Sequence, residues 1–310
     1  LMRTLLKVSP SMRQRCVRTA VAGLLASTFA VFAAAAPALA AEDSAPVIPR
    51  ATAAAVTPPD AATVMYFIYQ IDGKGETTYE VANGSVATYW FGHAFESEGK
   101  HYYTGFVWET AERYGKPGED QVGPETQVNI AESTFVLNDP ASERPWKFRG
   151  MEHTIGEFGA YERAPDVDTR RKPIEHRTPA GKLLLAVPDT SFENGITSDG
   201  YSLLVFDPER LKQDTDNKVW TYVGSVLTGE DNSAACADGE VMPCTSSTGE
   251  LVFSADGAND MPRVTVKPSG TTISGPNKTR QLGAADVTNY AFDVKTKPVS
   301  YTHLTLPTKA

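Results

Sequence analysis

The sequence lacks the short motifs that identify the common enzyme classes. It has no G-x-S-x-G nucleophile elbow, H-E-x-x-H metal motif, G-x-x-x-x-G-K-[ST] phosphate loop or strand-linked G-x-G-x-x-G. No long stretch shows the 3.6-residue periodicity of an amphipathic helix. A glycosidase needs only two carboxylates at a set separation, and 38 acidic residues neither establish nor exclude such a pair. Function has to be argued from composition and from the placement of aromatic residues.

Positive charge is scarce in the part of the chain that is expected to fold. Residues 41–298 carry 23 Lys and Arg against 38 Asp and Glu, a net charge of −15, because five of the 29 basic residues lie before this range and one after it. Nucleic acids and anionic membranes bind basic surfaces, so neither partner is expected. A solvated acidic surface is the simplest interpretation, with a cationic partner as the alternative. The one basic island, Arg170-Arg171-Lys172 with His176 and Arg177, is expected in an exposed loop, with docking of an anion or partner as its alternative.

The N-terminus has the three parts of an export signal. Three arginines precede an apolar stretch from Ala20 to Ala36, and Ala38-Leu39-Ala40 then supplies small residues before a cleavage site at Ala41. The apolar stretch is short and rich in alanine for a membrane span. We expect residues 1–40, starting from Met12, to be a signal peptide, which predicts a periplasmic or secreted protein with no membrane span after cleavage. An uncleaved anchor is the alternative.

Two further segments are set apart from the fold. Residues 41–62 are rich in Ala and Pro and predict a flexible tether. At the other end, the eleven residues Val299–Lys309 resemble the translation of a transposon-type sequencing adapter, VSYTHLTLPTK. The resemblance implies that residues 299–310 are not native and that the natural C-terminus is missing. Residues 63–298 then form one β-rich domain, or two abutting halves divided near 138–145.

Of three cysteines, Cys16 falls in the signal, which leaves Cys236 and Cys244. They lie eight positions apart in a loop rich in Asp, Gly and Ser. No second Cys/His pair lies near them, which argues against a metal site. An exported chain is expected to join such a pair as a disulfide.

Strand-sized runs of β-branched and aromatic residues alternate with turn signals along the chain. Asn83-Gly84, between the runs Thr77–Ala82 and Ser85–Glu96, is a strong hairpin signal because both residues tolerate positive φ. Short helices are expected at most at 109–114 and 208–213. The other predicted strands are Val64–Ile71, Lys100–Trp108, Thr134–Leu137, Trp146–Tyr161, Leu183–Val187, Tyr201–Phe206, Val219–Leu227, Glu250–Ser254, Arg263–Lys267 and Val287–Phe292.

This pattern predicts an all-β fold, an antiparallel β-sandwich or barrel built from meanders, with little helix. An incomplete β-propeller-like array is the alternative. It is suggested by Leu183–Val187, Tyr201–Phe206 and Trp220–Gly224, but no repeat supports it.

Aromatic residues are concentrated near the start of the predicted domain. Thirteen of the 29 fall between Tyr66 and Tyr114. The strand Ser85–Glu96 is apolar on both faces, whereas a half-solvated antiparallel strand should alternate apolar with polar residues. The sheet is therefore either covered on both sides, which is the simpler explanation, or has one face lining a ligand cavity.

Whether the two histidines of this meander, His93 and His101, lie on the same face of the sheet depends on the turn at Ser97–Gly99. With a two-residue loop, Glu96 opposes His101, and His93 lies on the other face from His101. With a three-residue loop and a bulge at Gly99, both histidines share a face and could form a metal or acid–base site. Gly99 followed by Lys100 slightly favours the second register. Histidines that are simply packed or hydrogen-bonded remain the plainer interpretation.

Three loops crowd oxygen ligands of the kind that calcium binds: Asp214–Asn217, Glu230–Asn232 and Asp256–Asp260. None has the spacing of an EF-hand, and Asx-rich turns explain all three without a metal. No cofactor is expected, with calcium as the alternative.

The preferred function is non-enzymatic binding of a small apolar or sugar-like ligand through the aromatic-rich sheet. The alternatives are an envelope hydrolase that uses carboxylates or His93 and His101, and an interaction module that docks another envelope protein. Aromatic faces pack on the C–H surface of either kind of ligand. The predicted ligand-binding residues are Trp90, His93, His101, Tyr102, Tyr103 and Trp108.

Overall fold

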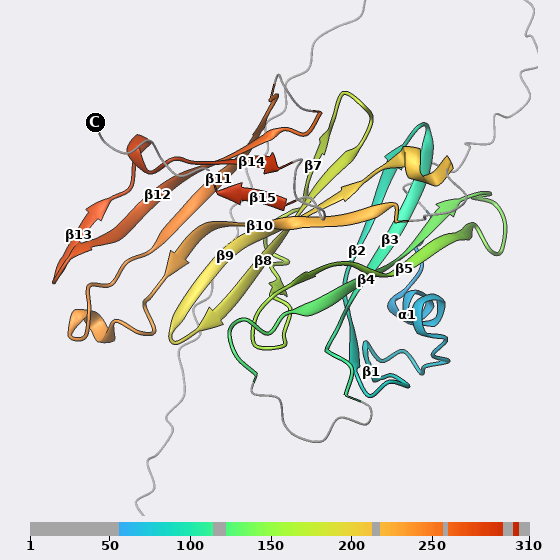
Figure 1. Ribbon diagram of the computed structural model, residues 1–310, viewed down its shortest axis with the longest axis horizontal. Coiled ribbons are helices and arrows are strands. Elements are labelled where there is room, and N and C mark those ends of the chain that lie inside the picture. The colour runs from blue at the N-terminus through green and yellow to red at the C-terminus, as the bar shows by residue number, and fades with distance from the viewer. Residues whose placement is uncertain (1–55, 114–121, 213–217, 257–259, 294–299, 304–310) are drawn as a thin grey trace, which may run out of the picture. The chain divides into compact units, whose positions relative to one another are not determined.

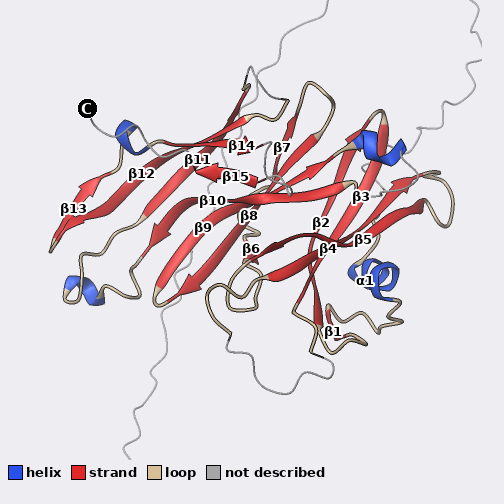
Figure 2. Ribbon diagram, in the orientation of Figure 1, coloured by secondary structure: helices blue, strands red, loops and turns tan. Residues whose placement is uncertain are grey.

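The computed structural model describes residues 56–113, 122–212, 218–256, 260–293 and 300–303. The predicted signal peptide and most of the predicted tether lie outside these residues. The described chain is an all-β antiparallel sandwich with one short α-helix, as the sequence predicts (Figures 1 and 2). Its strands form three sheets, which we call sheets 1, 2 and 3 in chain order. None of the described helices is long and apolar enough to cross a membrane.

Most of Val64–Ile71, predicted to be a strand, lies instead in helix α1 (Ala61–Tyr69). Asp60 caps the helix, because its carboxylate accepts a hydrogen bond of 2.8 Å from the backbone N–H of Thr63. Val64, Met65 and Ile68 are spaced for one helical face, and all three are buried against sheet 1. The helical spacing of these buried residues and the Asp60 cap together explain why this segment is a helix and not a strand.

Sheet 1 is a meander whose five strands pair in chain order, and the Asn83-Gly84 hairpin is confirmed. Residues 138–145 connect two antiparallel neighbours of this sheet. Glu109, predicted to begin a helical turn, ends a strand. The strands are β1 (Thr78–Glu80), β2 (Val86–Ser97), β3 (Lys100–Glu109), β4 (Val128–Leu137) and β5 (Trp146–Phe158).

The favoured register of the β2–β3 hairpin is wrong, because the loop has two residues rather than three. Glu96 pairs with His101, and Ser97 pairs with Lys100. Glu98 and Gly99 both have positive φ, 49° and 72°, as a type I′ turn requires. The three-residue alternative would have needed only glycine in that conformation.

A β-bulge in β2 explains why this strand is apolar on both faces. The register with β3 shifts between Tyr89 and Phe91, with Trp90 as the extra residue. Before the bulge, Ala87 and Tyr89 pack beside α1. After it, Trp90, Phe91 and Phe95 pack against sheet 2. Both faces of sheet 1 are covered, as the simpler explanation requires.

Sheet 2 lies between the other two sheets (Figure 1). Leu183, Leu185 and Leu204 point into the core shared with sheet 1, while Leu184 and Leu203 point into the core shared with sheet 3. Strands buried on both faces read as continuous apolar runs. The strands are β6 (Asp166–Val167), β7 (Ile174–Arg177), β8 (Leu183–Glu193), β9 (Ile196–Phe206) and β10 (Trp220–Asp231).

Sheet 3 is formed by β11 (Ser247–Ser254), β12 (Arg263–Gly275), β13 (Lys278–Gln281), β14 (Thr288–Asp293) and β15 (Ser300–His303). Strand β15, which falls in the adapter-like tail, pairs with β14. The predicted helix at 208–213 is the 3₁₀ helix η2 (Pro208–Lys212). The predicted Cys236–Cys244 disulfide is present, with the two Cα atoms 5.2 Å apart.

Candidate functional site

The face of sheet 2 that is turned toward sheet 1 changes from apolar to polar side chains halfway along its strands. Alternate residues of β8 are first apolar and fully buried, and then polar from Asp189 onward. The paired strands β9 and β10 make the same change at the same level. The polar positions on this face are Asp189, Ser191, Glu193, Ser198, Ser202, Tyr222 and Ser225.

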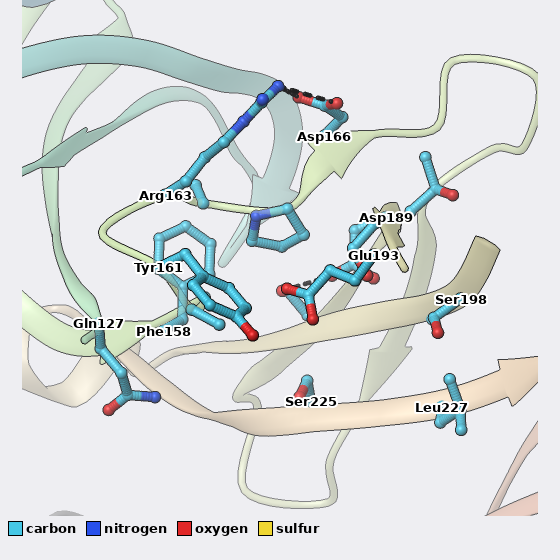
Figure 3. A pocket seen from close by; sticks show the side chains of 18 of the residues that line it. Gln127, Phe158, Tyr161, Arg163, Asp166, Asp189, Glu193, Ser198, Ser225 and Leu227 are labelled. Atoms are coloured by element: carbon cyan, nitrogen blue, oxygen red, sulfur yellow. Dashed lines mark hydrogen bonds and ion pairs between the residues drawn. The ribbon is translucent and has the colours of Figure 1, made fainter. Parts of the chain in front are cut away.

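These polar positions form the floor of a cleft of about 630 Å³ (Figure 3). Its opposite wall comes from the end of β5 and the segment that follows it, including Phe158, Tyr161 and Pro165. Two large apolar side chains that line the cleft are exposed, Tyr161 by 42% and Leu227 by 48%, whereas Phe192 alternates with Ser191 and Glu193 and so points to the other face of β8. Asp189 and Ser202 of the floor are buried, and Ser191, Glu193 and Ser225 are exposed. A concave site that combines an aromatic side chain with a few polar groups is typical of small-molecule binding.

Asp189 is the most buried charged group of the floor, with 6% exposure. The Ser202 hydroxyl donates to its carboxylate over 2.6 Å, and the backbone N–H of Ser202 also hydrogen-bonds to it. Burial raises the pKa of Asp189 to about 6 despite these bonds and the nearby charge of Arg171. Opposite it lies Gly200, where a Cβ atom would come within 2.9 Å of the carboxylate oxygen, so glycine makes room for the acid.

The Tyr222 hydroxyl lies beside the same carboxylate and interacts with the hydroxyls of Ser225 and Ser202. Burial raises the pKa of Tyr222 to about 12, so the phenol stays protonated and can donate. Its ring packs against Phe158 with centroids 5.6 Å apart. A Cβ atom at Gly156 would lie 2.7 Å from the Cβ of Tyr222, so this glycine lets the ring lie against β5.

The rim of the cleft is supported by the disulfide loop. Phe192 and Glu193 lead into the β8–β9 turn, where Asn194 and Gly195 adopt φ of 53° and 81°. A Cβ atom at Gly195 would lie 2.8 Å from the Cβ of Ala235, which is next to Cys236 in sequence. The bridged loop is therefore in close contact with the turn that carries the rim.

The six sequence-predicted residues do not surround one ligand, because sheet 1 divides them between its faces. Tyr103 packs on the α1 side and Tyr102 in the core toward sheet 2. His101, paired with Glu96, lies on the opposite face from His93. Trp108 is packed against the core between sheets 1 and 2. None of the six lines the cleft.

Two of these residues nevertheless link the sheets. Trp90 donates from Nε1 to the carbonyl of Pro165 over 2.9 Å and so fixes the cleft wall from behind. His93 lies between Phe91 and Phe95, and its Nε2 is 2.7 Å from Glu175 of β7. The hydrogen bond to Glu175 and the packing against both rings make His93 a structural contact between sheets 1 and 2.

Residues proposed for metal or partner binding have protein partners. Since His93 and His101 lie on opposite faces, they do not form a two-histidine site. Asn232 accepts from the backbone N–H of Thr245 over 2.7 Å, and Asp260 accepts from that of Ala180 over 2.9 Å. Within the described ranges no three His, Cys, Asp or Glu side chains are placed to hold a metal ion, and residues 214–217 and 257–259 lie outside those ranges.

The basic island is likewise tied into the structure. Arg170 and Arg171 both bind the Asp168 carboxylate over 2.8 Å. Arg171 also donates to the backbone carbonyl of Asp189 over 2.6 Å, so it supports the strand that carries the cleft floor. Arg170 is exposed, as expected, whereas Arg171 is partly buried.

The cleft was missed because its strands were predicted to stop too early. The alternation of Asp189, Ser191 and Glu193 continues the pattern of Leu183–Val187, and this continuation was the available signal. Comparisons with protein-family models, with curated proteins and with solved structures find no match to this chain.

Proposed function

We propose that the protein binds a small sugar-like ligand in the cleft between sheets 1 and 2, without converting it chemically. The observation that carries the proposal is a floor of hydroxyl groups and one buried carboxylate beside the exposed aromatic ring of Tyr161. A sugar offers hydroxyl groups to such a floor and a C–H face to such a ring. A purely apolar ligand would displace water from the floor without offering hydrogen bonds in return, at a cost of about 1–3 kcal/mol for each polar group left unsatisfied.

The arrangement of acids supports binding over hydrolysis. Asp189 and Glu193 lie on one face of the same strand, four positions apart. Their Cα atoms are therefore separated by about 13 Å at ~3.3 Å per residue. The carboxyl groups of a glycosidase pair lie only about 5 to 9.5 Å apart. Among the described residues no histidine lines the cleft, so none of them is placed to form an acid–base pair with Asp189.

The proposal includes an extracytoplasmic location, periplasmic or secreted. The Cys236–Cys244 bridge is compatible with an oxidising compartment, and the N-terminal sequence has the composition of an export signal. The aromatic meander, which the sequence predicts as the binding surface, contacts the cleft wall through the hydrogen bond from Trp90 to Pro165.

Titration calorimetry of the full-length protein with a panel of neutral, amino and acidic oligosaccharides tests the proposal. We expect at least one class to bind, and Tyr161→Ala to weaken it about three- to tenfold, the value of one aromatic contact. Ile273→Ala is the matched control, since Ile273 is a similarly exposed apolar residue away from the cleft. Absence of binding across the panel, or equal weakening by both variants, would contradict the proposal.

A further inference from the structure

Carboxylates outnumber cations around the cleft. Asp189 lies on the floor, and Glu193 and Asp166 line the rim. Arg163 is the single lysine or arginine among the described residues that line the cleft, and its guanidinium is 3.0 Å from Asp166 at the exposed rim (Figure 3). No other positively charged side chain among the described lining residues faces Asp189 or Glu193. The segment expected to fold, residues 41–298, is itself acidic.

The neighbours of Asp189 supply hydrogen bonds but no ion pair. In the described part of the chain, no Lys or Arg nitrogen lies within 4.0 Å of its carboxylate, and Ser202 is its hydrogen-bond donor. Arg171 lies nearby, but its guanidinium is engaged with Asp168 and with backbone carbonyls of residues 189 and 200. Asp199, on the adjacent strand β9, adds a further negative charge.

We propose that the ligand carries a protonated amine that pairs with Asp189, which makes it an amino sugar in preference to a neutral or acidic one. This inference rests on the proposed function and names the ligand class for the same cleft. An ammonium group has three donors and no acceptor. The floor offers the Asp189 carboxylate and the oxygen lone pairs of Ser202, Ser225 and Tyr222 as acceptors.

The charge balance gives the amine its advantage. A carboxylate that is removed from water gains more from an opposite charge than an exposed one does, because the local dielectric is lower. The surrounding acidic field also raises the local concentration of cationic ligands. An acidic sugar would meet Asp189 and Glu193 as like charges, and an N-acetylated sugar would bring no charge to them.

The test compares glucosamine oligomers with N-acetylglucosamine oligomers of equal length, by calorimetry on the full-length protein near neutral pH and low salt. We expect the amine form to bind at least tenfold more tightly. Asp189→Asn should weaken binding of the amine form at least tenfold more than binding of the N-acetylated form, so that the preference is lost. Glu250→Gln is the control, because Glu250 is exposed, is paired with Lys267 and does not line the cleft.

The comparison on the unaltered protein does not depend on whether a variant folds. Equal affinity for the two oligomers, or tighter binding of the N-acetylated one, would overturn the amine inference and leave the proposed function standing. A preference that persists in Asp189→Asn would place the amine elsewhere and would also overturn it. Failure of every sugar in the wider panel to bind would instead contradict the proposed function.

Discussion

Glu132 of β4 is a fully buried carboxyl group in the middle of sheet 1. It lies directly opposite Glu152 in the register of β4 with β5. The Thr134 hydroxyl donates to one of its carboxyl oxygens over 2.7 Å. The other oxygen, Oε1, has no hydrogen-bond partner among the described residues. Burial, reinforced by Glu152, raises the pKa of Glu132 to about 8, so this side chain is mostly protonated at neutral pH.

Glu132 therefore makes the stability of the fold depend on pH. Since its folded pKa of about 8 exceeds the ordinary value of 4.5, its contribution is complete below about pH 4.5 and is lost as pH rises through about 8. The free energy of unfolding should fall by up to ~1.4 kcal/mol per pH unit in this window. Glu132→Gln should flatten the slope, as measured by urea denaturation at several pH values.

Glu152→Gln is the matched control for this experiment. It removes the neighbouring charge but keeps the buried acid, so the pH slope should persist over a window that begins at the same value and ends at a lower pH. An unchanged slope in Glu132→Gln would show that another group dominates between pH 4.5 and 8.

Among the elements, hairpins and central strands were predictable, while α1 and the strand ends were not. Asn83-Gly84 and Leu183–Val187 carry strong local signals: turn residues that accept positive φ, and an apolar run buried on both faces. The run Val64–Ile71 is apolar enough to fit a strand or a helix, and only its packing on sheet 1 and the Asp60 cap distinguish them. The later half of β8 looked like loop because its inward side chains are polar.

The packing of α1 on β3 depends on Gly105. A Cβ atom there would lie 2.3 Å from Cγ2 of Val64. Gly105→Ala should destabilise the fold by about 1–3 kcal/mol through overpacking. Adding Val64→Ala should recover part of that loss, so a double-mutant cycle by chemical denaturation should give a coupling of at least ~0.5 kcal/mol. Additive effects of the two substitutions would show that α1 does not press on β3 at this point.

At the scale of the whole molecule, the complete cleft could not be predicted from the sequence, because its parts are distant along the chain. The wall at Phe158–Pro165, the floor of β8 and β9, and Tyr222 of β10 meet only when sheets 1 and 2 pack together. The fold class follows from local patterns that each strand carries by itself. A site of this kind depends on strand register, on the bulge at Trp90 and on the packing of one sheet against the other.

The Cys236–Cys244 disulfide bears both on the stability of the fold and on the proposed extracytoplasmic location. Thiol titration of the denatured protein, isolated from its native host without reductant, should find neither Cys236 nor Cys244 free. Replacing both by serine should lower the free energy of unfolding by roughly 2–3 kcal/mol, the chain-entropy value for so short a loop. Two free thiols in the isolated protein would contradict both the oxidised bridge and the proposed location.

The floor of the cleft belongs to the same three strands that, a few residues away, hold the leucine-rich core of sheet 2. A ligand that binds there meets side chains whose strands are held in place by backbone hydrogen bonds to their neighbours, with bulges in β10 only. Selectivity then resides in fixed spacings between oxygen atoms, and little conformational entropy is lost on binding. Any adjustment to ligands of different size falls to the rim around Phe192.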